Sequence, residues 1–301
     1  MMPVYLVAGI LDLLRECWWL VLIFVILVGP RFAARMEQKA EIAKAEAAMA
    51  AMSEKYPDNP SLTIDNTGVC KNLAEDARVI VLFLNDDESS WNIRDMKDYL
   101  TDAVEPALSF LEETAIEYGV QLSLDYSYYV DNEDAPVSIT YTGIIRDGDS
   151  ESLNPDILEQ SATALGFASK WDMLEQDRQD AGIEQIAYLV CANKNGRSYA
   201  SCVMGLEGTE YMMLYNQIPQ KWSRRNGVVH ELLHMFGAED LYSGNGKNAN
   251  REKLAKQLHR YDVMLEAKWH FKGNVVGPFT AYCIGWLDNL PEEYNCPEWW
   301  S

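Results

Sequence analysis

The segment from His230 to Asp240, with the sequence HELLHMFGAED, constrains the fold of this chain more than any other. A helix places His230 and His234 one turn apart on the same face, the spacing that lets two imidazoles bind one divalent ion. Glu231 then lies beside them, where a carboxylate can accept the proton of a water that the ion has acidified. Gly237 can adopt a positive φ and end the helix, so that the chain brings Asp240 to the same ion. The segment therefore predicts a catalytic zinc site, with three protein ligands and a fourth position open to water.

The same segment resembles the signature of the metzincin zinc metallopeptidases, which reads His-Glu-x-x-His-x-x-Gly-x-x followed by His or Asp. In this chain Asp240 stands at the last ligand position. The family also carries a methionine-containing turn beneath the metal site, and Met264 in the run YDVM at residues 261–264 meets this requirement. The likeness extends over residues 78–288, although residues 131–182 have no counterpart that can be placed.

The resemblance implies an α+β fold with a twisted mixed sheet, long helices and an active-site helix. It implies that His230, His234 and Asp240 hold Zn2+, while Glu231 is the general base that hydrolyses a peptide or protein substrate. It also implies that the edge strand nearest the cleft, expected at residues 198–204, receives the substrate as an extended peptide by strand addition.

The third ligand has two competitors in the sequence. Glu239 is adjacent to Asp240, and Glu252 lies on an expected helix at a distance that suits the other large branch of zinc peptidases. In that branch a Glu from a second helix completes the site. Gly237 favours Asp240, because only an early helix exit brings a residue so near in sequence back to the metal.

The motif also has alternative explanations. It can be an amphipathic helix in which Leu232, Leu233 and Phe236 fill a core and the histidines fall at helical spacing by chance. A catalytically silent, metallopeptidase-like binding module of the cell envelope is a second alternative. The intact Glu231 argues against it, because a module without catalysis needs no base beside the ion. A structural envelope protein is a third alternative, and zinc content would distinguish it.

Other polar residues are candidates of lower rank. Tyr242, Tyr261 and Tyr282 can donate to an oxyanion, but in a chain with 16 tyrosines ordinary packing is the better interpretation. The remaining histidines, His259 and His270, are interpreted as surface or satisfied core residues. The predicted site therefore consists of the four motif residues alone.

An uninterrupted apolar run occupies residues 17–28 and ends at a Gly-Pro pair. A membrane span needs about 20 residues, and residues 4–14, which are apolar apart from Asp12, can lengthen the run. A cleaved signal peptide is the alternative, but the segment before the run lacks the usual positive charge. Residues 1–30 are therefore predicted to be a single-pass transmembrane anchor.

The sequence contains opposing indications of membrane orientation. Basic residues follow the apolar run and, by the positive-inside tendency, place the next domain in the cytoplasm. Cysteine spacing indicates the opposite, because Cys191 and Cys202 flank a turn-like NKNG run and can face each other across a hairpin. Cys283 and Cys296 are a second possible pair, and two disulfides would indicate an oxidising compartment. The alternative is that all six cysteines are reduced and buried; we expect an extracytoplasmic catalytic domain.

Composition and length limit the partners and the domains. A formal net charge of −21 argues against nucleic acid as a partner, since phosphate binding needs clustered Lys and Arg. Residues 31–72 begin with an Ala/Glu/Lys-rich stretch, which predicts a juxtamembrane helix and then a linker. Residues 73–301 are long enough for one globular catalytic domain.

Hydrophobic periodicity predicts how strands and helices alternate in this domain. We expect a helix at residues 95–118, ended by Gly119, and a motif helix introduced by Ser223. Further helices are expected at residues 155–181 and 278–287. The predicted strands are at residues 78–84, 120–130, 137–145, 183–191, 198–204 and 210–216.

Overall fold

The structure is a computed structural model that describes residues 70, 72–148, 154, 156–201, 210–217, 223–242, 249–266, 273–296 and 299. The predicted membrane anchor and the helix and linker that follow it lie almost entirely outside the described residues. Within these ranges, no helix combines the length and the apolar character needed to cross a bilayer.

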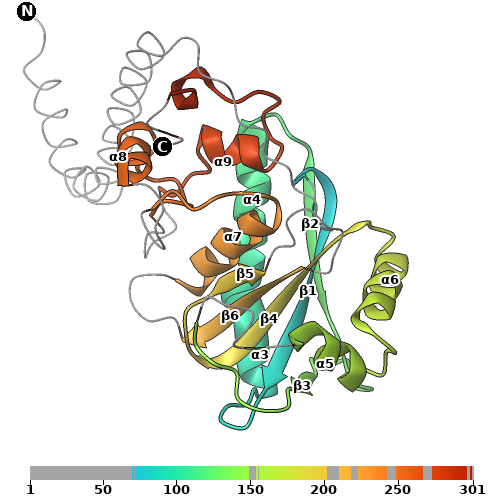
Figure 1. Ribbon diagram of the computed structural model, residues 1–301. Helices are drawn as coiled ribbons and strands as arrows, with labels where there is room; N and C mark the ends of the chain where they lie inside the picture. The colour runs from blue at the N-terminus through green and yellow to red at the C-terminus, as the bar shows by residue number, and fades with distance from the viewer. Residues whose placement is uncertain are drawn as a thin grey trace, which may run out of the picture.

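A six-stranded sheet forms the centre of the domain (Figure 1). Its order is β2-β1-β4-β6-β5, and the short β3 pairs with β1 beyond the end of β2. All pairs are parallel except β5 with β6, which is antiparallel. The strands are β1 (Glu75–Asn85), β2 (Leu122–Tyr128), β3 (Ser138–Thr140), β4 (Gln185–Asn195), β5 (Tyr199–Ser201) and β6 (Tyr211–Gln217). The expectation of a mixed sheet with helices is confirmed.

The central strands are buried on both faces, as their continuous apolar sequences require. One face of the sheet packs against α3 (Ile93–Tyr99), η1 (Leu100–Val104), α4 (Glu105–Glu117) and α7 (Arg224–Met235). The other face is covered by α5 (Ile157–Ala164) and α6 (Lys170–Ala181) (Figure 1). The layers therefore place the motif helix α7 on the same face as the long helical run before β2.

The predicted helix at residues 95–118 forms as a continuous helical run that contains one π-helical segment, η1. The side chain of Asn92 caps its start by accepting a hydrogen bond from the Asp95 amide at 2.9 Å. Pro106 has no amide hydrogen for the carbonyl four residues earlier, which accounts for the wider turn next to it. Gly119 ends the run with φ +71°, as predicted.

Three short helices follow α7 in the part of the carboxyl-terminal segment that the structure describes. They are α8 (Ala249–Leu258), α9 (Pro278–Cys283) and the 3-10 helix η3 (Glu292–Tyr294). The helix expected at residues 278–287 is shorter than predicted, because Gly285 adopts φ +81° and turns the chain. In Figure 1, α7 lies between the sheet and the loops that join these helices.

The predicted cysteine hairpin is wrong. β5 pairs with β6 rather than with β4, so β6 separates the strands that Cys191 and Cys202 were expected to join. Cys191 is a buried reduced thiol, and Cys202 lies outside the described residues. Cys283 and Cys296 are also buried reduced thiols, so the second expected disulfide is not formed. The extracytoplasmic placement stays a prediction without support from these pairs.

Candidate metal centre

Helix α7 presents the motif from within the core. The side chain of Ser223 caps the helix by accepting a hydrogen bond from the Asn226 amide at 3.2 Å, as the sequence indicated. His230 and Glu231 are only 2% and 5% exposed, although both are polar. The neighbouring apolar side chains do fill the core, as the amphipathic alternative expects: Val228, Val229, Leu232, Leu233 and Phe236. Helix α7 therefore packs its apolar side chains into the core and also places His230 and Glu231 close together.

The chain turns back after α7 at Gly237. This glycine adopts φ +98°, and the amide of Ala238 donates to the carbonyl of Leu233 at 3.0 Å. A residue with a side chain rarely adopts such a φ, so glycine permits the early exit. The turn returns Asp240 to the exposed end of the histidine pair, as predicted.

Three ligand atoms converge at this point. The Nε2 atoms of His230 and His234 lie 3.2 Å apart. Oδ1 of Asp240 lies 3.2 Å from the first and 3.1 Å from the second. Among the described residues, these three form the group of side chains that is suited to hold a metal ion.

Each imidazole is held from behind by a main-chain carbonyl. Nδ1 of His230 donates to the Val263 oxygen at 3.1 Å, and Nδ1 of His234 donates to the Ala238 oxygen at 2.7 Å. A carbonyl oxygen only accepts, so Nδ1 carries the hydrogen in both rings. In the neutral rings each Nε2 then keeps a lone pair that is directed at the other ring and at Asp240. Three lone-pair atoms in mutual contact repel one another unless positive charge lies between them.

The pKa shifts of Asp240 and His234 also indicate that positive charge is stabilised at this point. Burial alone would raise the pKa of Asp240, but its contacts with both imidazoles outweigh burial and hold the pKa well below its usual range. Burial alone would lower the pKa of His234, but Asp240 and Glu231 raise it. The cluster therefore stabilises protons or a cation at its centre.

Glu231 is a buried carboxylate beside the cluster. Burial raises its pKa, and the nearby Asp240 raises it further. The neighbouring His230, His234 and Arg197 oppose this rise. A raised pKa brings a carboxylate toward the range in which it can both accept and return a proton near neutral pH.

The segment that contains Met264 lies against the cluster. Met264 is fully buried, and its carbonyl accepts a hydrogen bond from the Leu241 amide at 3.0 Å. Asp262 shapes the turn, because its carboxylate accepts from the amides of Met264 and Gly277 at 2.8 and 2.9 Å. Burial exceeds the effect of these hydrogen bonds and raises the pKa of Asp262 to about 6. The turn thereby delivers the Val263 carbonyl to His230.

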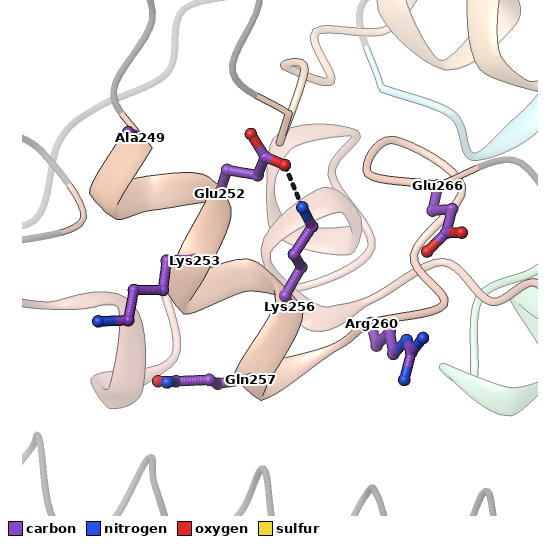
Figure 2. Close-up of a pocket in the computed structure, with 7 residues that line it drawn as sticks. All are labelled: Ala249, Glu252, Lys253, Lys256, Gln257, Arg260 and Glu266. Atoms are coloured by element: carbon purple, nitrogen blue, oxygen red, sulfur yellow. Dashed lines mark hydrogen bonds and ion pairs between the residues drawn. The ribbon is translucent and has the colours of Figure 1, made fainter.

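The two carboxylates that compete with Asp240 for the role of third ligand pair with basic side chains instead. Glu239 accepts a hydrogen bond from Arg251 at 2.7 Å. Glu252 pairs with Lys256 on α8, as Figure 2 shows. Glu252 and Lys256 line an open surface pocket of about 770 Å³, together with Ala249, Lys253, Gln257, Arg260 and Glu266. Within the described residues, Asp240 is thus the carboxylate that joins the two histidines.

Two residues outside the predicted set act on the cluster. The Tyr242 ring stacks on His230, with centroids 6.2 Å apart and an interplanar angle of 23°. Burial raises the pKa of Tyr242, the nearby Asp240 raises it further, and Arg197 opposes this rise. The sequence analysis assigned Tyr242 to ordinary packing, and it did not consider Arg197. The available sequence signal for Arg197 was its place just after a buried parallel strand, where binding residues often gather.

The other histidines and tyrosines of the sequence analysis do not join the three ligand atoms. His259 stacks on Tyr294 with ring centroids 6.4 Å apart, and burial lowers its pKa to about 4. Tyr261 lines a small pocket of about 280 Å³ beside His259. Tyr282 is partly buried on α9, and His270 lies outside the described residues.

The resemblance to the metzincins rests on the sequence motif alone and stays a prediction. The structure adds the convergence of His230, His234 and Asp240. No protein-family model matches this chain, and no curated protein matches it either.

Proposed function

We propose that this chain is a zinc-dependent metallopeptidase in which His230, His234 and Asp240 bind the metal and Glu231 is the general base. The observation that supports the proposal most is the convergence of three lone-pair atoms, with each imidazole fixed through its second nitrogen. Metal-binding histidines characteristically have such a hydrogen bond on the nitrogen opposite the ion.

The spacing of the ligand atoms fits zinc. Bonds of about 2.0–2.1 Å at tetrahedral angles separate two ligand atoms by about 3.3 Å. The observed separations of 3.1 to 3.2 Å are close to this value on all three edges. Two nitrogens and one oxygen are a common set in catalytic zinc sites, and they leave a fourth direction for substrate or water. The residues present therefore suit the metal that the resemblance implies.

Protein side chains perform the proton transfers in the proposed reaction. The chemistry that zinc supplies when bound is polarisation of the peptide carbonyl and acidification of water. Glu231 accepts the proton of the attacking water and later returns it to the leaving amine. Its burial beside the cluster keeps the carboxylate in place and keeps its pKa raised. The carbonyls of Val263 and Ala238 hold both imidazoles during these steps.

The sheet edge next to the site suits an extended peptide substrate. β5 stands at the end of the strand order, and both β5 and β6 contact α7. A strand at an edge offers unpaired main-chain donors and acceptors to an added strand. Attachment of this domain to a membrane through residues 1–30, on the extracytoplasmic side, belongs to the same proposal and rests on the sequence.

A catalytically silent binding module is the second candidate. It would use the same cleft for recognition and would have no use for a base at the metal. Glu231 is nevertheless present in this chain and buried, and His230, His234 and Asp240 lie close enough to shift its pKa. Burial of an ionisable carboxylate is costly, so its presence favours catalysis.

Metal analysis and a proteolysis assay on the same preparation test the proposal. We expect the full chain to contain one zinc per molecule and to hydrolyse an unstructured protein. Glu231→Gln should abolish turnover and retain zinc, while the control Glu113→Gln, at an exposed position of α4, should change neither. Activity that survives thorough chelation, or bound iron without hydrolysis, would contradict the proposal.

A further inference from the structure

A small pocket lies between three segments that are distant in the sequence. It has a volume of about 280 Å³ and is formed by the end of α4, by the end of α8 with the residues that follow it, and by residues 275–278, which lead into α9. None of the four residues of the proposed metal centre lines it, so the pocket is a separate place on the molecule. Its volume lies just below the range of about 300–1,000 Å³ that is typical of small-molecule sites. The pocket therefore suits a small ligand rather than a folded partner.

The walls of this pocket are mainly apolar and are held in place by hydrogen bonds. The apolar and aromatic side chains that line it are Leu258, Val275, Val276, Pro278, Tyr118 and Tyr261. The hydroxyl of Tyr118 donates to the Val276 carbonyl at 2.6 Å. The amide of Val275 donates to the Tyr261 carbonyl at 3.0 Å. Walls that are already bonded in this way lose little freedom when a ligand binds, and their apolar surface favours an apolar or aromatic group.

Two exposed side chains of opposite charge also line the pocket. They are Glu117, the last residue of α4, and Arg260, two residues after α8. Within the described part of the chain, neither takes part in an ion pair, so both charges border the same space without neutralising each other. The guanidinium carbon of Arg260 lies 5.9 Å from the ring centre of Tyr261, which keeps this cation at the pocket. Burial lowers the pKa of the lining His259 to about 4, so this imidazole is neutral at physiological pH and adds no second cation.

A free α-amino acid matches this combination of groups. Its ammonium can pair with a carboxylate, its carboxylate can accept two hydrogen bonds from a guanidinium, and its side chain can enter apolar space. A residue inside a polypeptide carries neither of these charges, and a terminal residue carries only one of them. A ligand with a single charge would therefore leave either Glu117 or Arg260 without a partner.

We propose that this pocket binds a free amino acid with an apolar or aromatic side chain, with its ammonium on Glu117 and its carboxylate on Arg260. The apolar walls select the side chain, and the two charges select the free amino acid over a peptide. The inference is independent of the proposed peptidase function, because the pocket contains none of the residues that would bind zinc or transfer protons.

Calorimetric titration of the full chain with L-phenylalanine tests the inference. We expect saturable binding of one molecule per chain. N-acetyl-L-phenylalanine lacks the ammonium and L-phenylalanine amide lacks the carboxylate, so each should bind about tenfold more weakly, because each loses hydrogen bonds between charged groups. Glycine has no side chain to bury and should not bind measurably. Glycine also controls for binding to zinc, since it carries the same chelating groups as L-phenylalanine.

Single substitutions assign each charge of the ligand to its partner. Glu117→Gln should weaken L-phenylalanine binding about tenfold and leave N-acetyl-L-phenylalanine unaffected, because that ligand has no ammonium. Arg260→Met should weaken L-phenylalanine binding about tenfold and leave the amide unaffected, because the amide has no carboxylate. The controls are Glu113→Gln, one turn earlier on α4, and Lys253→Met on α8. Both remove an exposed charge that does not line the pocket and should leave the affinity unchanged.

Several results would overturn the inference. An absence of saturable heat with L-phenylalanine would remove the site. Equal affinity for L-phenylalanine and both of its derivatives would mean that the pocket takes an apolar group alone. Binding that neither Glu117→Gln nor Arg260→Met weakens would lie elsewhere on the molecule. Because the measurement is binding rather than hydrolysis, each of these results leaves the proposed peptidase function standing, and a chain without peptidase activity can still bind L-phenylalanine.

Discussion

Arg251 of α8 donates a hydrogen bond to Glu239 at 2.7 Å, and Glu239 is the residue immediately before the proposed ligand Asp240. The guanidinium carbon of Arg251 also lies 4.9 Å from the ring centre of Phe279 and 5.2 Å from that of Trp299. A buried arginine between aromatic rings and a carboxylate has little freedom to move. The loop that carries Asp240 is thereby tied to α8, α9 and the end of the chain.

This relationship predicts that Arg251→Met weakens both the fold and metal binding. The change leaves Glu239 without its cation, and we expect the free energy of unfolding to fall by about 2 kcal/mol. Zinc affinity should fall about tenfold, because Asp240 is then held less firmly. Chemical denaturation and competition with a chelator measure the two effects. The control Lys256→Met removes an exposed pair on the same helix and should change stability by less than about 1 kcal/mol. Equal effects of the two substitutions would contradict the positioning role.

Asp240→Ala should reduce zinc affinity more than any other single acidic substitution near the site. Removal of one of three protein ligands is expected to weaken binding by about 100-fold or more. Glu252→Ala provides the matched comparison, because its carboxylate pairs with Lys256 in the structure. Competition with a chelator distinguishes them, and normal binding by the Asp240 variant with loss in the Glu252 variant would move the ligand to α8.

The buried ion pair of Asp86 and Lys194 predicts how stability depends on pH. Burial would raise the pKa of Asp86, but hydrogen bonds from Lys194, Ser89 and main-chain amides lower it to about 2. Because the folded pKa lies below the ordinary value of 3.8 for an aspartate, the ionised carboxylate stabilises the fold above about pH 4. This contribution, about 2 kcal/mol, is lost as the pH falls from about 4 to 2.

Denaturation of Asp86→Asn at several pH values measures this contribution. The variant should be less stable than wild type at pH 7, and the difference should shrink toward pH 2. Asp288→Asn, at an exposed position, is the control and should follow the wild type across the range. A constant difference at every pH would show that Asp86 stabilises the fold through packing rather than charge.

Gly277→Ala should disturb the turn that contains Met264. An added Cβ would lie 2.4 Å from Oδ2 of Asp262, the carboxylate that shapes this turn. We expect a loss of about 2 kcal/mol in unfolding free energy and weaker zinc retention, since the turn supplies the carbonyl that holds His230. Gly119→Ala meets no atom within 4 Å and should cost only the strain of its positive φ, about 1 kcal/mol. Denaturation curves of both variants measure the difference.

Local signals in the sequence predicted much of the fold and the centre of the site. The Ser223 cap, the positive φ of Gly237 and the apolar runs of β1 and β4 act over a few residues, so their outcome could be read from neighbours alone. The pairing of β5 with β6 could not be read in this way. A turn-like sequence suggested a hairpin with β4, but the choice of partner strand depends on packing across the whole sheet.

The residues that surround the ligands were less predictable for the same reason. Arg197 acts on the site from a loop 33 positions before His230, and Arg251 reaches it from a separate helix. Arginines at such distances carry no periodic or spacing signal that marks them as neighbours. Tyr242 was close in sequence, but one tyrosine among 16 gives no indication of its role until its ring is seen against His230.

The main-chain origin of the hydrogen bonds behind the two imidazoles has a practical consequence. Because Val263 and Ala238 contribute only their carbonyl oxygens, replacing their side chains leaves both orienting contacts intact. Systematic alanine mutagenesis would therefore score these positions as dispensable, and one of them is already alanine. Only replacement of the peptide linkage itself, for example by an ester at the following residue, would alter these acceptors directly and reveal their contribution.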